Sequence, residues 1–137
     1  MVNLTTFSNL QANGYLVNKG TVTTIATAGV VTFSAAEMLG GLILRDPAGA
    51  GRADLVPSAA SIYSELGSPA KVTGLSFDFT IRNTAGAAET ITLTTDVGTT
   101  MTMSGTMTIA QNNSKTFRVV FATPTTATVY SLGTVVH

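Results

Sequence analysis

The sequence lacks several residue types on which catalytic and metal sites depend. It contains no cysteine and no tryptophan among its 137 residues, and its one histidine is His137. Without cysteine, disulfides, zinc–thiolate sites and a cysteine nucleophile are excluded. A Ser–His–Asp triad would have to use His137 at the end of the chain, where side chains are poorly held. We therefore expect that the protein is not an enzyme and uses no metal and no cofactor.

Charge is also scarce. Seven basic and seven acidic residues make up 10% of the chain and give a net charge of zero, whereas charged residues form about 25% of an average soluble domain. A chain near zero net charge tends to self-associate. Two interpretations follow: a soluble domain solvated by its Thr, Ser and Asn side chains, or a protein whose surface is largely covered by neighbouring subunits. We favour the second, and we expect a homo-oligomer, most simply a trimer.

Two further classes of partner are disfavoured by the distribution of charge and apolar residues. The basic residues are scattered along the chain, whereas a nucleic-acid binder needs a concentrated basic patch. No run approaches the roughly 20 apolar residues that a membrane span requires. The first 20 residues are rich in Asn and show no signal-peptide pattern. We expect synthesis in a cytoplasm and no nucleic-acid or membrane partner.

The second half of the chain is rich in threonine, which is β-branched and favours extended backbone. Apolar residues alternate there with Thr and other polar residues, the period of two that predicts half-buried strands. The expected inward faces are Phe77, Phe79 and Ile81; Ile91 and Leu93; Met101 and Met103; Met107 and Ile109; Phe117, Val119 and Phe121; and a last strand over residues 127–132. Short strands joined by Gly, Asn and Thr turns are typical of a sandwich or barrel.

The first half predicts short connections rather than long elements. Residues 21–26 and 30–33 suggest a hairpin that turns at Ala28 and Gly29. Ser34 and Glu37 form a capping-box pattern that predicts a short helix ending at the following glycines. A buried strand is expected over residues 42–44, and a second helix after Pro57. The predicted fold class is therefore all-β, an antiparallel β-sandwich of jelly-roll type with one or two short helices. The predicted organisation is an N-terminal arm over residues 1–20 and a single domain over residues 21–137.

Two patterns in the sequence suggest chemistry but have plainer interpretations. A pair of carboxylates could act as acid and base, but each has a structural role available, such as Glu37 in the capping box and Asp46 before Pro47. The candidates are Glu37, Asp46, Asp54, Glu65, Asp78, Glu89 and Asp96. The segment 45–57, RDPAGAGRADLVP, lacks the third glycine of a dinucleotide loop and the Gly-Lys-Ser/Thr of a P-loop. We expect a mobile loop there, or an arm that orders against a neighbouring subunit.

Three strings carry a resemblance to a known group of proteins: GGLILRDPAGAGRADLVPSAASI, FDFTIRNTAGAAETITL and MSGTMTIAQNNSKTFRVVF. Over residues 33–132 the sequence resembles small virion structural proteins of tailed bacteriophages. The resemblance implies a head decoration, cement or capsid fibre-like protein, often trimeric, that binds the major capsid protein at the virion surface. The group has no catalytic residues to transfer to this chain.

The expected function is therefore capsid decoration through protein–protein contacts. The candidate contact residues for neighbouring subunits or the capsid are Arg45, Asp46, Arg52 and Asp54. The alternative is a receptor- or glycan-binding module of a tail fibre or adhesin. Such sites usually offer clustered aromatic faces, whereas this chain has three tyrosines, well separated in sequence.

Overall fold

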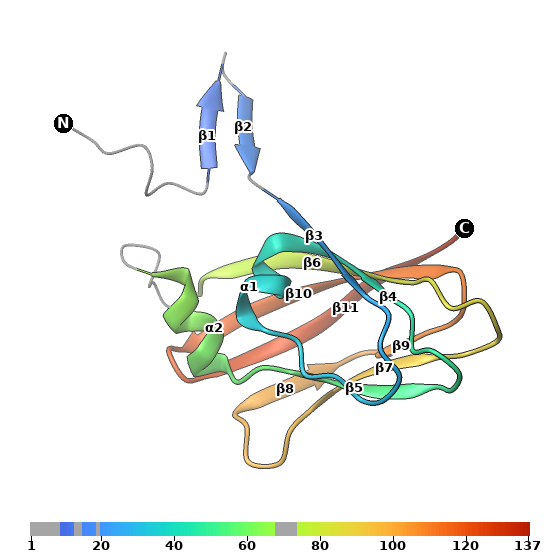
Figure 1. Ribbon diagram of the computed structural model, residues 1–137. Helices are drawn as coiled ribbons and strands as arrows, with labels where there is room; N and C mark the ends of the chain where they lie inside the picture. Colours follow the sequence, from blue (N-terminus) through green and yellow to red (C-terminus); the bar gives the residue numbers. More distant parts are fainter. Residues whose placement is uncertain (1–8, 13–14, 19, 68–73) are drawn as a thin grey trace.

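The structure is a computed structural model that describes residues 9–12, 15–18, 20–67 and 74–137 (Figure 1). The chain is mostly β-strand, with two short helices. The strands are β1 Asn9–Ala12, β2 Tyr15–Asn18, β3 Thr21–Ile25, β4 Gly41–Arg45, β5 Arg52–Val56, β6 Ser76–Asn83, β7 Ile91–Thr95, β8 Met101–Ser104, β9 Thr108–Ile109, β10 Asn113–Thr123 and β11 Thr126–Val136. The helices are α1 Ala35–Gly40 and α2 Ala59–Leu66.

Most of the strands belong to two mixed sheets. The larger has six strands in the order β3-β4-β6-β10-β11-β8, and the smaller has three in the order β5-β7-β9. Strands β1 and β2 pair with each other in a separate two-stranded sheet. The long antiparallel hairpin β10–β11 lies between β6 and β8 in the larger sheet, and a β-bulge at Leu132 shifts its register. Figure 1 shows β5, β7 and β9 below this hairpin, and α1 and α2 beside β6 and β10 towards the left of the view.

One face of the six-stranded sheet builds the core. Phe79 and Ile81 of β6 alternate with exposed or half-buried residues, and so do Phe117 and Val119 of β10. These side chains form one apolar cluster with Met38 of α1, with residues of α2 and with residues of the smaller sheet. The predicted inward face of the phenylalanines is confirmed: the rings of Phe79 and Phe117 stack with their centroids 5.3 Å apart. The helices and the smaller sheet therefore share one face of the larger sheet.

The local signals for α1 are confirmed in detail. The Glu37 amide donates to Ser34 Oγ at 3.2 Å, and the Ser34 amide donates to Glu37 Oε2 at 2.7 Å, which closes the capping box. The helix ends at Gly41, whose φ of 95° lies in the left-handed region. Helix α2 begins after Ser58, as expected from Pro57.

Three expectations are corrected. The sheets are mixed rather than antiparallel throughout, because β3–β4, β4–β6, β5–β7 and β8–β11 are parallel pairs. The predicted hairpin of residues 21–33 is wrong: β3 pairs with β4, and Thr32 instead bridges to Leu55. The predicted loop over residues 45–57 is wrong for Arg52–Val56, which forms β5.

The predicted division at residue 20 stays a prediction. Much of the expected arm, residues 1–8, 13–14 and 19, lies outside the described residues.

Candidate functional site

The four predicted contact residues lie close together, but two of them face the interior. Arg45 ends β4 and Asp54 lies in β5, and both side chains are completely buried. The Arg45 Nε–H donates to Asp54 Oδ2 at 2.7 Å, and the second contact, from Nη2 to Oδ1, is 3.3 Å long. The pair is therefore bidentate, which is the strong geometry for arginine and carboxylate.

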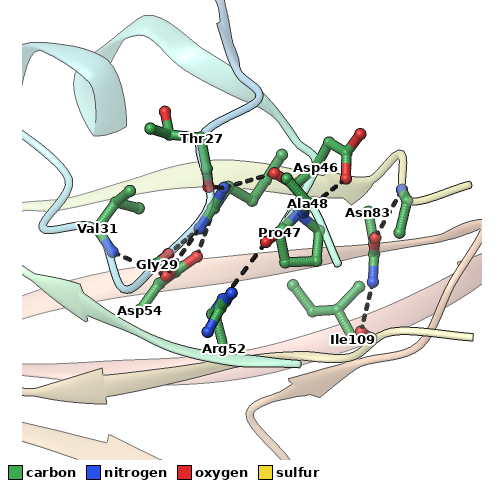
Figure 2. A network of polar contacts seen from close by, with 12 residues as sticks. Thr27, Gly29, Val31, Asp46, Pro47, Ala48, Arg52, Asp54, Asn83 and Ile109 are labelled. Atoms are coloured by element: carbon green, nitrogen blue, oxygen red, sulfur yellow. Dashed lines mark hydrogen bonds and ion pairs between the residues drawn. The ribbon is translucent and has the colours of Figure 1, made fainter. Parts of the chain in front are cut away.

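The remaining N–H groups of the Arg45 guanidinium bind backbone carbonyl oxygens around it. They donate to the carbonyl oxygens of Thr27, Gly29 and Asp46 at 2.8, 2.8 and 2.6 Å. Asp54 Oδ1 also accepts the amide of Val31 at 3.0 Å. In Figure 2 Thr27, Gly29 and Val31 lie around this pair: Thr27 and Gly29 contact Arg45, and Val31 contacts Asp54. The buried pair thus ties the segment after β3 to β4 and β5.

Asp46 and Arg52 shape the connection between β4 and β5. Asp46 Oδ1 accepts the amide of Ala48 at 2.9 Å, and Arg52 Nε–H donates to the Pro47 carbonyl at 3.4 Å (Figure 2). Residues 49–51 at the tip are exposed. That these residues contact another subunit stays a prediction. Only residues 49–51 and the half-buried Asp46 and Arg52 are accessible for such a contact, whereas Arg45 and Asp54 are buried.

The outer face of the six-stranded sheet is a second candidate surface. Two rows cross β3, β4 and β6: Val22, Leu42 and Thr80 in one, and Thr24, Leu44 and Arg82 in the next. Leu42 and Leu44 are half-buried, yet neither belongs to the apolar core cluster. Among the described residues, no helix or second sheet is recorded packing against this face. As far as residues 9–12, 15–18, 20–67 and 74–137 are concerned, this face is therefore open, with apolar side chains at the β3–β4 end.

Towards β10 and β11 the same face carries a charged pair and a tyrosine. Arg118 contacts Asp78 through two hydrogen bonds of 2.7 and 2.8 Å, and both side chains are about half exposed. The hydrogen bond from Arg118 holds the pKa of Asp78 below its usual value, and the same bond raises the pKa of Arg118. Tyr130, which is 41% exposed, lies directly opposite Arg118 on β11.

A pocket lies beside β8 and the start of β11. Its lining consists of small side chains and threonines, with Met101 as the largest residue: Thr99, Thr100, Met101, Thr102, Ala122, Thr126, Ala127 and Thr128. These residues offer hydroxyl and methyl groups but no ionisable side chain. The pocket can hold a small neutral group and offers no general acid or base.

The possible catalytic groups are not assembled into a recognisable set. His137 Nε2 lies 2.8 Å from Ser114 Oγ at the exposed end of the β10–β11 hairpin. Within the described ranges, no carboxylate is recorded as a hydrogen-bond partner of this histidine, so the third member of a triad is missing. The described residues also contain no group of three or more potential metal ligands. That the protein is not an enzyme stays a prediction.

The buried polar residues were not predicted from the sequence. The signal was present in the alternation: Arg45 follows Ile43 on the inward face of β4, and Asp54 precedes Val56 on that of β5. Asn83 continues the inward face of β6, and its side chain holds the backbone of Glu89, Ile109 and Ala85. A charged residue at an inward position predicts a buried, paired group, because an unpaired buried charge is costly.

Neither described helix has the length and apolar character that a membrane span needs. Comparison with known proteins adds no relative: no family model matches the chain, and neither the curated proteins nor the solved structures contain a significant match.

Proposed function

We propose that this chain is a structural protein of a tailed-bacteriophage particle, which decorates and stabilises the capsid through protein–protein contacts. It does so as a homo-oligomer, a trimer, that binds the major capsid protein at the virion surface after synthesis in the host cytoplasm. The resemblance of residues 33–132 supports this identity. The main observation in favour of protein–protein contacts is the open outer face of the six-stranded sheet.

The chemistry of that face suits a protein neighbour. Leu42, Leu44 and the 59%-exposed Val22 supply apolar contact at one end. Asp78 and Arg118 compensate each other's charge, so Arg82 is left as the one unpaired cation among the outward residues of β6. One cation does not make the basic stripe that nucleic acid requires. A mixed apolar and hydroxyl surface with little charge matches the core of a protein interface.

The proposal also covers how the six-stranded and the three-stranded sheet are arranged. We propose that the two larger sheets form a sandwich related to the jelly roll, as expected for a shell protein. The single core cluster, to which both sheets contribute Phe117 and Ile91, supports the arrangement. In this form the inner faces of both sheets pack against each other, and the outer face of the larger sheet remains available to neighbours.

The arm of residues 1–20 and the tip of the β4–β5 connection complete the proposed contact surface. Segments that order on contact carry an entropic cost. An oligomer that engages several capsid sites at once compensates through high effective concentration. Many weak contacts can then raise the temperature at which the shell opens.

A receptor- or glycan-binding module is the second candidate, and one observation favours it. Tyr130 lies beside the Arg118–Asp78 pair on the outer face, which places an aromatic ring next to a guanidinium and a carboxylate. Sugars are bound by stacking on aromatic rings together with such polar groups.

Thermal opening of the particle tests the proposal. Particles that carry the Leu44→Lys variant, or that lack residues 1–20 of the protein, should release DNA at a lower temperature than intact particles. Val97→Lys is the matched control, because Val97 is 99% exposed in a loop away from the sheet face. Light scattering of the purified protein should give a trimer of the 14.0-kDa chain.

Two outcomes would overturn the proposal. Equal release temperatures for particles with and without the protein would exclude a stabilising role. Glycan binding that is lost in a Tyr130→Ala variant, together with unchanged shell stability, would transfer the assignment to the second candidate.

A further inference from the structure

The end of β11 extends beyond its neighbour on the edge of the six-stranded sheet. Strand β8 pairs with residues 127–130 of β11 and no further. After the bulge at Leu132, residues 133–136 pair with residues 113–116 of β10 on the other side. In the part of the chain that the structure describes, nothing pairs with the outer edge of residues 132–136.

The direction of the backbone groups on this edge follows from one hydrogen bond. The His137 amide donates to the Asn112 carbonyl at 2.9 Å, so the backbone of residue 137 faces β10. Successive residues of a strand direct these groups to alternate sides. The N–H and C=O groups of Val136 and Thr134 therefore face away from β10, towards solvent.

The side chains leave this edge unguarded. Leu132 is 50% exposed, Val135 58% and Val136 76%. Residues 119–136 contain no Asp, Glu, Lys or Arg. Proteins protect free edges with charged residues, proline, bulges or short strands. Here the register runs without a further shift from the bulge to Val136, so a continuous, uncharged template remains available.

We propose that this edge pairs with the same edge of a second copy of the chain, antiparallel, about a two-fold axis at Thr134. In this register Thr134 lies opposite Thr134 of the second copy. Leu132 lies opposite Val136, and Gly133 lies opposite Val135. Each apolar side chain thus meets an apolar residue or a glycine.

Self-complementarity is what identifies a second copy as the occupant. Apolar and Thr–Thr cross-strand pairs stabilise a sheet, whereas like charges placed opposite each other destabilise it. Self-pairing about residue 134 would put a charge at that position opposite an identical charge, but residues 132–136 carry none. A two-fold contact of one patch with itself is also the commonest way in which copies of a chain associate.

This contact goes beyond the proposed function. It joins two copies, so it is distinct from the contact that closes a trimer, and on a particle it would link neighbouring trimers. Edge pairing of five residues buries less than the roughly 1,000 Å² of a stable interface. We therefore expect a weak association that many copies on one shell would reinforce.

The absence of cysteine makes a direct test possible. In a hydrogen-bonded antiparallel pair, opposite Cα atoms are about 5.5 Å apart, so thiols in the Thr134→Cys variant lie within reach of a short bismaleimide. We expect this variant to form covalent dimers at least ~10-fold faster than Thr125→Cys, which places a thiol at the exposed opposite end of the same hairpin. Separately, Thr134→Lys and Thr134→Glu should each abolish association, and mixing the two variants should restore it.

Equal cross-linking of the Thr134→Cys and Thr125→Cys variants would overturn the proposal. So would efficient cross-linking of Thr134→Cys to a Val22→Cys variant alone, because the edge would then take β3 of the next copy. A trimer in light scattering without the Thr134→Cys dimer would reject this contact and leave the proposed function standing. A Thr134→Cys dimer, together with no effect of the protein on particle opening, would support this contact and reject the proposed function.

Discussion

Arg45 shows how a charged residue becomes part of a small protein's interior. Its side chain is completely buried, and it makes five hydrogen bonds to Asp54 and to three backbone carbonyls. Removing two charges from water is expensive, so such a pair adds little net stability compared with apolar residues of similar volume. Its effect is on conformation: it holds residues 27–31 against β4 and β5.

Breaking the pair from one side should be strongly destabilising. Arg45→Met leaves the Asp54 carboxylate buried without its cation, and we expect the free energy of unfolding to fall by about 3–5 kcal/mol. Urea denaturation measures this loss. Arg52→Met is the matched control and should cost less than about 1 kcal/mol. The double variant Arg45→Met/Asp54→Leu should recover part of the loss. If it is no more stable than the single variant, the buried pair is not the cause.

Lys115 makes the free energy of unfolding depend on pH in the alkaline range. It is 5% exposed, its ammonium donates to the Thr106 carbonyl at 2.7 Å, and burial lowers its pKa. The unfolded chain keeps the ordinary lysine pKa of about 10.4. Between the lowered pKa and that value the unfolded state binds more protons, so the free energy of unfolding rises with pH.

The variant Lys115→Met should remove this rise. We expect the difference in urea midpoint between the wild-type protein and the variant to shift in favour of the wild type as pH increases towards 10. A difference that stays constant over the alkaline range would mean that Lys115 is solvated as well as an exposed lysine.

At the scale of elements, β6 and β10 hold the centre of the core through their phenylalanines. Phe79 is 1% exposed and stacks on the fully buried Phe117. Phe79→Ala removes these contacts and leaves a cavity, and we expect a loss of about 3–5 kcal/mol. Val97→Ala, at a 99% exposed site, should change stability by less than about 0.5 kcal/mol. A melting temperature for Phe79→Ala within a degree or two of the wild type would contradict the packing.

These elements also show which features a sequence can predict. Alternation identified the inward face of β6, and the capping box identified α1, because both signals are local. The parallel pairing of β4 with β6 could not be predicted, since alternation defines a face but not a partner. The predicted hairpin of residues 21–33 failed for a specific reason. Arg45 binds the carbonyls of Thr27 and Gly29, and Asp54 binds the amide of Val31, so the chain turns towards the buried pair.

The candidate surfaces were less predictable than the fold. Residues 45–57 were identified as a contact loop by their composition, but burial of Arg45 and Asp54 depends on which strands surround them. The outer face of the larger sheet could not be identified from the sequence, because the outward Leu42 and the inward Ile43 are both strongly apolar. Only the position of the helices and the smaller sheet determines which of the two is covered.

At the scale of the whole molecule, the two faces of the larger sheet have different roles. One holds the core and the other is open, and the net charge of zero offers no long-range repulsion between copies. Association is therefore limited by local complementarity, at the outer face for the proposed capsid contact and at the edge of β11 for the self-contact.

The strand order also dictates when the protein can fold. In the larger sheet the β10–β11 hairpin lies between β6 and β8, and it follows all the other strands of that sheet in the sequence. Until this hairpin has been synthesised, β6 lacks its antiparallel partner β10, and β3 and β4 have only an incomplete sheet to join. A nascent chain of this kind keeps apolar strands exposed until the hairpin has emerged, so chaperones can meet it before the larger sheet is complete.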